Sequence, residues 1–128
     1  MTKELTEEIA LEIAAVAHTA NRIYCNSIGD FSQVPWELAP GWQKDSGVLG
    51  VMGVILDDKD PRQSHQNWFD HKVKEGWTFG QTKDEQKKTH PCLLPYDMLT
   101  PEQKAKDHLF VSVVKLMGAY LNVTCPAA

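Results

Sequence analysis

The sequence has no hydrophobic run long enough to cross a bilayer. Its longest apolar stretch, residues 48–56, is interrupted by Gly50 and Gly53, whereas a membrane-spanning helix needs about 20 consecutive apolar residues. Residues 1–8 also lack the pattern of a secretory signal peptide. We therefore expect a soluble, cytoplasmic protein that does not bind membranes.

The sequence has few cysteines, and it has fewer basic than acidic residues. The three cysteines, Cys25, Cys92 and Cys125, are widely spaced and odd in number, which indicates a reduced, intracellular protein rather than a disulfide framework. The formal net charge is -4. Because a protein that binds DNA or RNA needs an excess of Lys and Arg to displace counterions, this charge argues against a nucleic-acid polymer as partner. A small anionic ligand held by a few local cations remains allowed.

Motifs for metal binding and for nucleophilic catalysis are missing as well. His65 and His71 are not spaced as a helical metal pair, and His90 is followed by a single cysteine rather than by a pair. No nucleophile elbow is present, and isolated cysteines are commonly buried and inert. We expect no metal, no cofactor and no catalytic residue. The alternative is an enzyme that cleaves a signalling nucleotide with His18 or His90 as acid or base.

The composition that is present is typical of one globular domain. The chain has 128 residues, of which 42% are hydrophobic and 23% are charged, enough to form a core without metals or disulfides. We expect a single domain over residues 1–128, with a core from about residue 6 to 118 and a loosely docked tail over 119–128.

The expected fold class is mainly α, a compact bundle of about four helices. The first begins at Thr6, whose hydroxyl can cap free backbone amides. Its apolar residues recur at helical spacing and predict the face that packs in the core: Ile9, Ile13, Val16, Ala20 and Ile23. The opposite side carries small residues and then His18, Asn21, Arg22 and Cys25. This side is either an exposed polar end, or it is covered by another helix at its start and opens onto a cleft at its end.

Three further helices are predicted. Residues 42–56 fit helix or strand, and we favour a buried helix because Gly47, Gly50 and Gly53 form a smooth ridge for close packing. Residues 63–75 are predicted to form a helix that ends at Gly76, with Trp68 and Phe69 turned inward and Val73 nearby. The last helix begins at Thr100, with Pro101 and Gln103 as a capping box, and is expected to stop at Gly118.

Residues 76–97 combine motifs that carry a family resemblance. The motif Gly-Trp-Thr-Phe-Gly at residues 76–80 is followed by a lysine-containing turn, by His-Pro at 90–91 and by Pro-Tyr at 95–96. In this order the motifs resemble the ryanodine-receptor repeat, or RyR domain. The upstream half, including residues 17–25 and 64–68, looks like the stand-alone bacterial and phage members, so the resemblance extends from about residue 9 to 117.

The resemblance implies a small, mostly helical domain with short strands or a small hairpin near Trp77. For stand-alone members it also implies the sensing of nucleotide-derived signals in bacterial immunity and phage conflict, without catalysis. A phage protein of this kind would act in the host cytoplasm as a sponge for an immune signalling nucleotide. In the calcium-release channels the repeats are non-catalytic appendages.

A nucleotide-like ligand needs aromatic planes, cations or amides for phosphate, and polar groups for ribose. The chain offers suitable groups in residues 76–97 and near the end of the first helix. We predict that the ligand lies between these two segments. The predicted ligand-binding residues are Asn21, Arg22, Trp36, Trp77, Phe79, Gly80, Lys87, Lys88, His90 and Tyr96.

A purely structural role is an alternative interpretation for each of these residues. Trp36 is also suited to plug the edge of the core, Trp77 and Tyr96 to lie within it, and the lysines to form a solvated turn. A third class of function is a protein-interaction module that uses the same surface, including self-association into a homo-oligomer.

Overall fold

The computed structural model describes residues 2–124 of the chain. Four helices dominate this part: α1 (Glu7–Ser27), α2 (Gly41–Asp57), α3 (Pro61–Lys74) and α4 (Pro101–Tyr120). Single turns of 3-10 helix cover Trp36–Leu38 and Tyr96–Met98. The short strands are β1 (Lys3–Glu4), β2 (Thr78–Phe79), β3 (Thr89–His90) and β4 (Val123–Thr124). The predicted mainly helical class is therefore confirmed.

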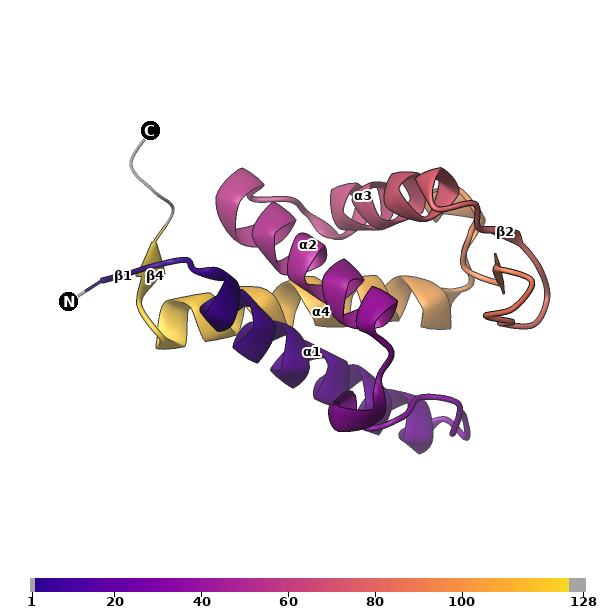
Figure 1. Ribbon diagram of the computed structural model, residues 1–128, viewed down its shortest axis with the longest axis horizontal. Coiled ribbons are helices and arrows are strands. Elements are labelled where there is room, and N and C mark those ends of the chain that lie inside the picture. Colours follow the sequence, from indigo (N-terminus) through magenta and orange to yellow (C-terminus); the bar gives the residue numbers. More distant parts are fainter. Residues whose placement is uncertain (1, 125–128) are drawn as a thin grey trace.

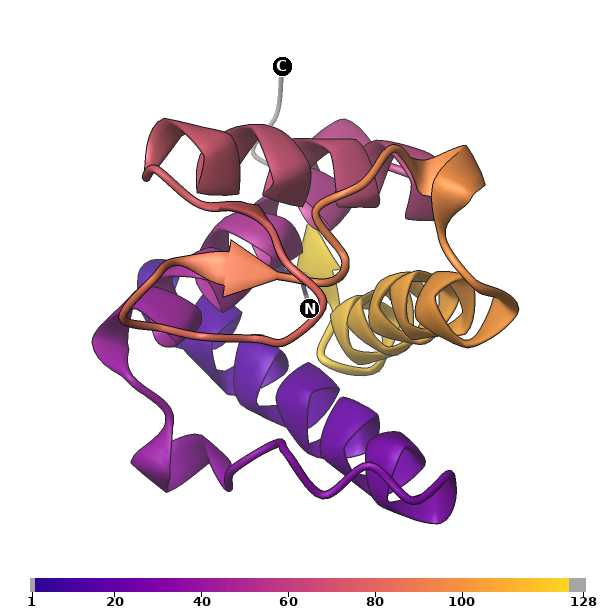
Figure 2. The same cartoon turned by 90° about the vertical axis from the view of Figure 1, so that its right-hand side faces the viewer.

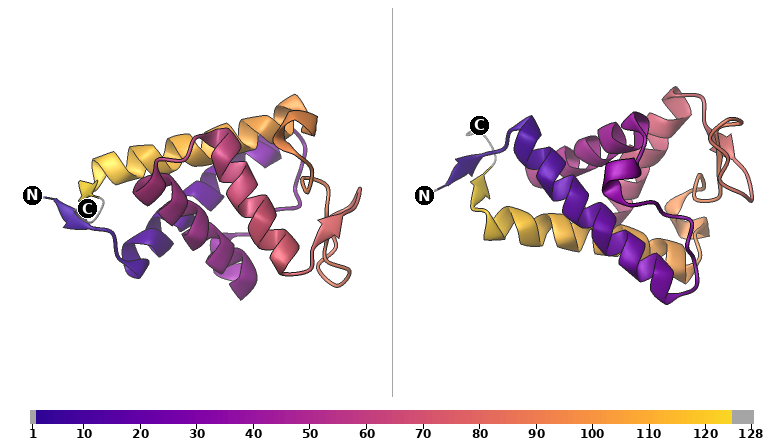
Figure 3. Two further views of the ribbon diagram at one scale, coloured as in Figure 1. Left: turned by 90° about the horizontal axis from the view of Figure 1, so that it is seen from above. Right: turned by 60° about the horizontal axis from the view of Figure 1, so that its bottom comes forward.

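The helices form a bundle with one strand pair at each end. Strands β1 and β4 lie at one end of the molecule, whereas β2 and the chain around it lie at the other (Figure 1). Helices α1 and α4 pack along each other, and α2 crosses both of them (Figure 3). No helix within residues 2–124 is long and apolar enough to cross a membrane.

Helix α1 buries its small residues, not the apolar face that its sequence predicts. Ala10, Ala14 and Ala17 are buried together with Ile13, whereas Ile23 is 64% exposed. The small alanine side chains allow α2 and α4 to pack closely against this side of α1. The predicted core face was wrong beyond Ile13, and the alternative in which a second helix covers the small-residue side is correct.

Helix α2 is a helix rather than a strand, as predicted, and its glycines allow close packing. A Cβ placed on Gly47 would lie 3.3 Å from the Cβ of Ala14 on α1. A Cβ placed on Gly50 would lie 2.8 Å from the Phe110 ring on α4. The glycine ridge thus accommodates both neighbouring helices.

Helix α3 ends near Gly76 as predicted but begins two residues earlier than the predicted Gln63. Asp60 and Gln63 form a capping box around Pro61, and Gly76 follows the helix with a φ of +90°. Val73, expected near the inward-facing Trp68 and Phe69, is 51% exposed, while the polar His65 and Lys72 are both 2% exposed. Polar groups can be buried there because they bond to other parts of the protein, as described below.

Helix α4 begins with the predicted capping box of Thr100 and Gln103 but does not stop at Gly118. It continues to Tyr120 because Gly118 is buried against Ile55, so the glycine serves helix packing rather than termination. Strand β4 then pairs in parallel with β1. The expected loose tail is therefore wrong for residues 119–124, and residues 125–128 lie outside the described part.

Short strands lie next to Trp77 as predicted, but they pair in parallel and do not form a hairpin. The Thr78 amide donates to the Lys88 carbonyl at 2.9 Å, and the Gly80 amide donates to the His90 carbonyl at 3.3 Å. Between the strands the chain folds back at Asp84, whose carboxylate accepts the amides of Gln86 and Lys87. This loop closes one end of the bundle (Figure 2).

Candidate functional site

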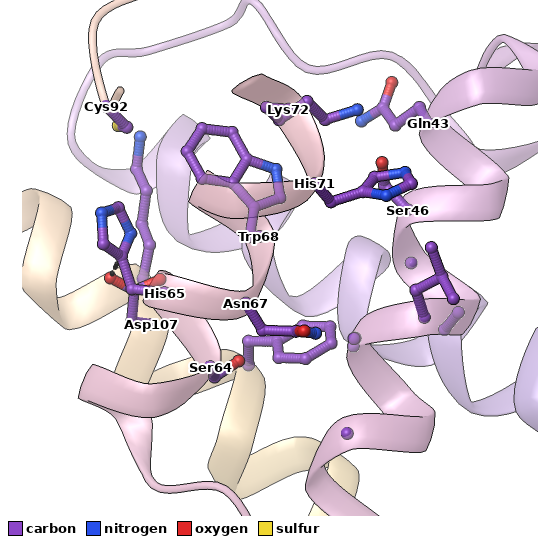
Figure 4. A pocket seen from close by; sticks show the side chains of 18 of the residues that line it. Gln43, Ser46, Ser64, His65, Asn67, Trp68, His71, Lys72, Cys92 and Asp107 are labelled. Atoms are coloured by element: carbon purple, nitrogen blue, oxygen red, sulfur yellow. Dashed lines mark ion pairs between the residues drawn. The ribbon is translucent and has the colours of Figure 1, made fainter. Parts of the chain in front are cut away.

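One large pocket lies among the four helices and the β2–β3 segment. Its volume is about 610 Å³, within the range typical of small-molecule sites. The chain has four tryptophans, and all four line this space: Trp36, Trp42, Trp68 and Trp77. We refer to it as the tryptophan pocket. Figure 4 shows α3 running through the view, with Trp68 and Lys72 rising from it.

Trp42 and Trp77 form the aromatic pair of the pocket. Their ring centroids are 5.1 Å apart, with the planes tilted by 49°. The ammonium group of Lys72 lies 4.6 Å from the Trp42 centroid and 5.6 Å from that of Trp77. Cation–π attraction and a 3.1 Å hydrogen bond to Glu75 Oε1 compensate for the burial of this charge.

Two further lysines bring positive charge to the same region. Lys83, from the loop between β2 and β3, places its ammonium group 5.5 Å from the Trp42 centroid. Burial lowers the pKa of Lys83, and within residues 2–124 it makes no ion pair. Lys106 on α4 lies 3.9 Å from Asp30. We call Lys72, Lys83 and Lys106 the lysine cluster.

The pocket is more positive than the chain as a whole. Five lysines and three aspartates are among its lining residues, an excess of two positive charges with neutral histidines. The complete chain carries a net charge of -4. Positive potential is therefore concentrated in the concave part of the molecule, where it can attract an anion.

His90 is held neutral beside the lysine cluster. Its Nδ1 accepts the Cys92 backbone amide at 3.0 Å, so the proton of the neutral ring is on Nε2. Burial, and then the charges of Lys83, Lys106 and Lys72, lower the pKa of His90 to about 4. At neutral pH His90 can donate a hydrogen bond from Nε2, but it is not an acid with a readily lost proton.

His65 is buried at the base of the pocket and links three parts of the fold. Its Nε2 donates to the Leu94 carbonyl at 2.7 Å, and its Nδ1 lies 3.5 Å from Asp107 Oδ2 on α4 (Figure 4). Burial alone would lower the pKa of His65, but the bonds to Asp107 and Leu94 outweigh it and raise the pKa. Both ring nitrogens are therefore used in holding α3, α4 and the connecting segment together.

A second group of pocket side chains is neutral and rich in amides. His18 Nε2 donates to the Val34 carbonyl at 2.6 Å. The Gln43 Nε2 lies 3.5 Å from both His18 Nδ1 and Gln33 Oε1. We call His18, Asn21, Gln33 and Gln43 the amide wall, since all four line the pocket and can exchange hydrogen bonds with hydroxyl or base groups.

Ser46 on α2 contributes a polar atom that has no partner. Its Oγ is buried and is the sole buried side-chain nitrogen or oxygen within residues 2–124 without a hydrogen bond. Ser46 also lines the tryptophan pocket. A buried hydroxyl is normally bonded, so this atom is available to a ligand group that enters the pocket.

The thiols of the site are poor nucleophiles. Cys92 lines the pocket, and burial raises the pKa of the Cys92 thiol. Burial also raises the pKa of Cys25, which is fully buried at the end of α1. Both are therefore protonated at neutral pH, and the thiol form is not the nucleophilic one. Cys125 lies outside the described residues.

Four of the ten residues predicted as ligand-binding line the tryptophan pocket. These are Asn21, Trp36, Trp77 and His90. They come from α1, the segment after it, and residues 76–97. The structure thus brings together the two segments between which the site was predicted. Trp77 is only 5% exposed, so it also belongs to the fold's interior.

The other six predicted residues do not line the pocket. Arg22 donates from Nε to the Gln33 carbonyl at 3.2 Å and so holds a segment that does line it. The Tyr96 hydroxyl bonds to His108 at 3.0 Å, and its ring lies under Arg62 and Lys104. The remaining four belong to the β2–β3 segment outside the lining: Phe79, Gly80, Lys87 and Lys88.

Each of these four has a structural setting of its own. Phe79 is 50% exposed, and Lys87 is exposed. Lys88 donates to the Glu75 carbonyl at 2.8 Å. A Cβ on Gly80 would lie 2.6 Å from the Cβ of Thr89, so this glycine lets β2 and β3 approach each other.

Sequence reasoning missed the lysine cluster, Trp42, Trp68, Gln43 and Ser46 as site residues. One signal was available: Trp68 and Lys72 are four residues apart and therefore lie on one face of a helix. No comparable signal identifies Lys83 or Lys106, because their approach depends on tertiary packing. Among the described residues no group of three or more His, Cys, Asp or Glu side chains is arranged to hold a metal ion.

Comparison with known families identifies the part of the chain that carries this architecture. The family model of the RyR domain matches residues 56–122, just over half of the chain. The match includes α3, β2, β3 and α4, and with them Trp68, Trp77, His90 and the lysine cluster. Helix α1, most of α2 and the amide wall precede it. By this match the chain belongs to the RyR domain family.

Proposed function

We propose that the protein binds a small anionic, nucleotide-derived ligand in the tryptophan pocket and leaves it chemically unchanged. The observation that carries this proposal is the meeting of four indoles with an excess of lysines in one cavity of about 610 Å³. Indole rings stack on nucleobases, and lysines bind phosphate as point charges. The pocket therefore combines both kinds of group that a nucleotide needs.

The amide wall supplies a third kind of contact. Asn21, Gln33 and Gln43 line the same pocket as the lysine cluster and carry neutral hydrogen-bonding groups. Ribose hydroxyls and base edges are donors and acceptors that side-chain amides can match. A ligand with a charged part and a neutral polar part would contact the lysine cluster and the amide wall at once.

Binding without turnover is supported by the state of the titratable groups. His90 is neutral and its Nδ1 is occupied by the Cys92 amide. Both nitrogens of His65 face protein acceptors, and those of His18 face Val34 and Gln43. A general base needs an accessible acceptor nitrogen, and these contacts occupy the ring nitrogens that could accept a proton.

The test is calorimetry with a panel of cyclic dinucleotides, cyclic oligonucleotides and ADP-ribose derivatives, followed by chemical identification of the recovered ligand. We expect at least one compound to bind and to be recovered intact. Recovery of an altered compound would identify an enzyme that cleaves a signalling nucleotide. Failure of the whole panel to bind would refute the proposal.

A pair of glutamine variants links binding to the pocket. Gln43→Ala removes a member of the amide wall, whereas Gln86→Ala changes an exposed glutamine of the β2–β3 loop that does not line the pocket. We expect Gln43→Ala to weaken binding several-fold, because a hydrogen bond contributes about 0.5–1.5 kcal/mol. Gln86→Ala should bind like the parent protein, and equal losses in both variants would place the ligand elsewhere.

Two biological roles are consistent with binding without turnover. A sensor transmits the bound state to another protein, whereas a sponge lowers the free concentration of an immune signalling nucleotide, as a phage protein in the host cytoplasm would. The dissociation rate separates the two roles. Release within seconds fits a sensor that resets, and retention for hours fits a sponge.

A second candidate function is an interaction module, which includes self-association. The observation in its favour is a group of exposed apolar side chains at the end of α1 and in the segment that follows. Ile23 is 64% exposed, Phe31 75% and Leu38 72%. Sedimentation over a range of concentrations tests it: a monomer at every concentration would exclude self-association, leaving only partners of another sequence.

A further inference from the structure

We infer that the lysine cluster is a subsite for two adjacent phosphate groups, so that the ligand is a nucleoside diphosphate or a nucleotide with an internal diphosphate linkage. This inference rests on the proposed function, and it specifies the ligand class that the pocket accepts. It also assigns the phosphate contacts to Lys72, Lys83 and Lys106, rather than to the exposed lysines of the β2–β3 loop.

The three ammonium groups converge from three different elements. Lys72 extends from α3, Lys83 from the β2–β3 loop and Lys106 from α4. The first two lie 4.6 and 5.5 Å from the centroid of the same Trp42 ring. All three are close enough to His90 for their charges to act on its ring. They therefore surround one part of the pocket rather than lining its whole length.

The carboxylates near the cluster do not neutralise it. Glu75 is bound to Lys72, and Asp30 is 3.9 Å from Lys106, near the limit of an ion pair. Both carboxylate side chains are 35% exposed, so water screens their charges. Lys83 forms no ion pair within residues 2–124, although the charge of Glu85 acts on it. Its partly buried positive charge is therefore available to an anion.

A diphosphate matches this arrangement better than a single phosphodiester. It brings two or more negative charges on neighbouring phosphorus atoms, while a diester brings one. Each lysine offers three donors on a compact charge, and the cluster can therefore contact oxygens of both phosphates. The neutral His90 adds an Nε2 donor without adding a charge, because its Nδ1 is bound to the Cys92 amide.

The aromatic pair of Trp42 and Trp77 stabilises the lysine cluster when no anion is bound. Like charges in a partly buried space repel one another, which disfavours the folded protein. The Trp42 ring attracts Lys72 and Lys83 through cation–π contacts, which oppose this repulsion. An arriving anion would therefore meet cations that are already positioned, which reduces the entropic cost of binding.

The probes are inorganic pyrophosphate and inorganic phosphate, titrated into the whole protein by calorimetry at constant ionic strength and pH. We expect pyrophosphate to bind about tenfold more tightly than phosphate, since each added charge-assisted hydrogen bond is worth about 1.5–3 kcal/mol. In NMR spectra pyrophosphate should shift the indole N–H signals of Trp42 and Trp77.

Matched lysine variants assign the contacts. Lys83→Gln and Lys106→Gln should each weaken pyrophosphate binding by about tenfold. Lys87→Gln makes the same charge change in the same loop as Lys83, but at an exposed position outside the pocket, and should change affinity less than twofold. Thermal unfolding of each variant verifies that it is folded.

Two results would overturn the inference. One is equal affinity for pyrophosphate and phosphate, or no binding of either probe. The other is an equal effect of Lys83→Gln and Lys87→Gln, which would show that only general charge matters. If a nucleotide of the panel still binds under either result, the proposed function stands and only the diphosphate subsite is lost.

Discussion

Acid should destabilise the protein through His90 alone by about 3 kcal/mol. When the pH is lowered from 7 to 4, the imidazole ring of His90, which is neutral beside the lysine cluster, responds to the change. Its pKa is about 4 in the folded protein and about 6.5 in an unfolded chain. His90 therefore binds a proton more weakly in the folded state than in the unfolded state.

The size of the effect follows from this difference. Above pH 6.5 the ring is neutral in both states, and His90 contributes no pH dependence. Between pH 6.5 and 4 only the unfolded state takes up the proton, so the free energy of unfolding falls by about 1.36 kcal/mol per pH unit. Below pH 4 both states are protonated and the loss stops at about 3 kcal/mol.

The assay is urea unfolding at pH 7, 6, 5 and 4, performed on the parent protein and on His90→Asn. The asparagine Oδ1 can accept the Cys92 amide as Nδ1 does, but it does not titrate. The contribution of carboxylates is common to both proteins, so the difference between the two curves isolates His90. Parallel curves from pH 7 to 4 would show that the lysine cluster and burial do not hold this ring neutral.

Three further predictions concern stability. Because the pKa of His65 is raised, its contribution is fully present below about pH 6.5 and is lost as pH rises through the folded pKa; unfolding at pH 6 and 8 should show this loss in the parent protein and not in His65→Gln, whose amide can keep the bond to Leu94. Ser46→Ala removes an unpaired buried hydroxyl and should raise the free energy of unfolding by about 1 kcal/mol more than Ser112→Ala on the exposed side of α4; an equal change in both variants would mean that Oγ of Ser46 is satisfied. Gly50→Ala should destabilise by about 1–2 kcal/mol, because the new Cβ would lie 2.8 Å from the Phe110 ring and overpacking outweighs the better helix propensity; Gly41→Ala, where no atom lies within 4 Å of the new Cβ, is the control, and no loss in melting temperature for Gly50→Ala would contradict the packing.

Local signals predicted the helices well because they act over a few residues. Thr6 and the Thr100–Gln103 box each begin a helix as predicted, and each needs only a side chain three residues from an amide. Buried faces were less predictable. Which side of α1 is covered depends on how closely α2 and α4 approach, and that distance is set by alanines and glycines rather than by the largest apolar residues.

In the candidate site too, local patterns identified some residues, whereas the positions of others depend on tertiary packing. Trp36, Trp77 and His90 stand near recognisable motifs, and residue chemistry pointed to them. Lys83 and Lys87 belong to one short loop and have the same chemistry, but only Lys83 lines the pocket. Their difference arises from the turn at Asp84 and the parallel pairing of β2 with β3, which a local pattern does not specify.

The pairing of β1 with β4 has a consequence for how this domain can be joined to others. Lys3 lies beside Val123 and Glu4 beside Thr124, so the polypeptide enters and leaves the fold at one point, away from the β2–β3 end (Figure 1). Such a unit can be spliced into a surface loop of a host protein without stretching the loop.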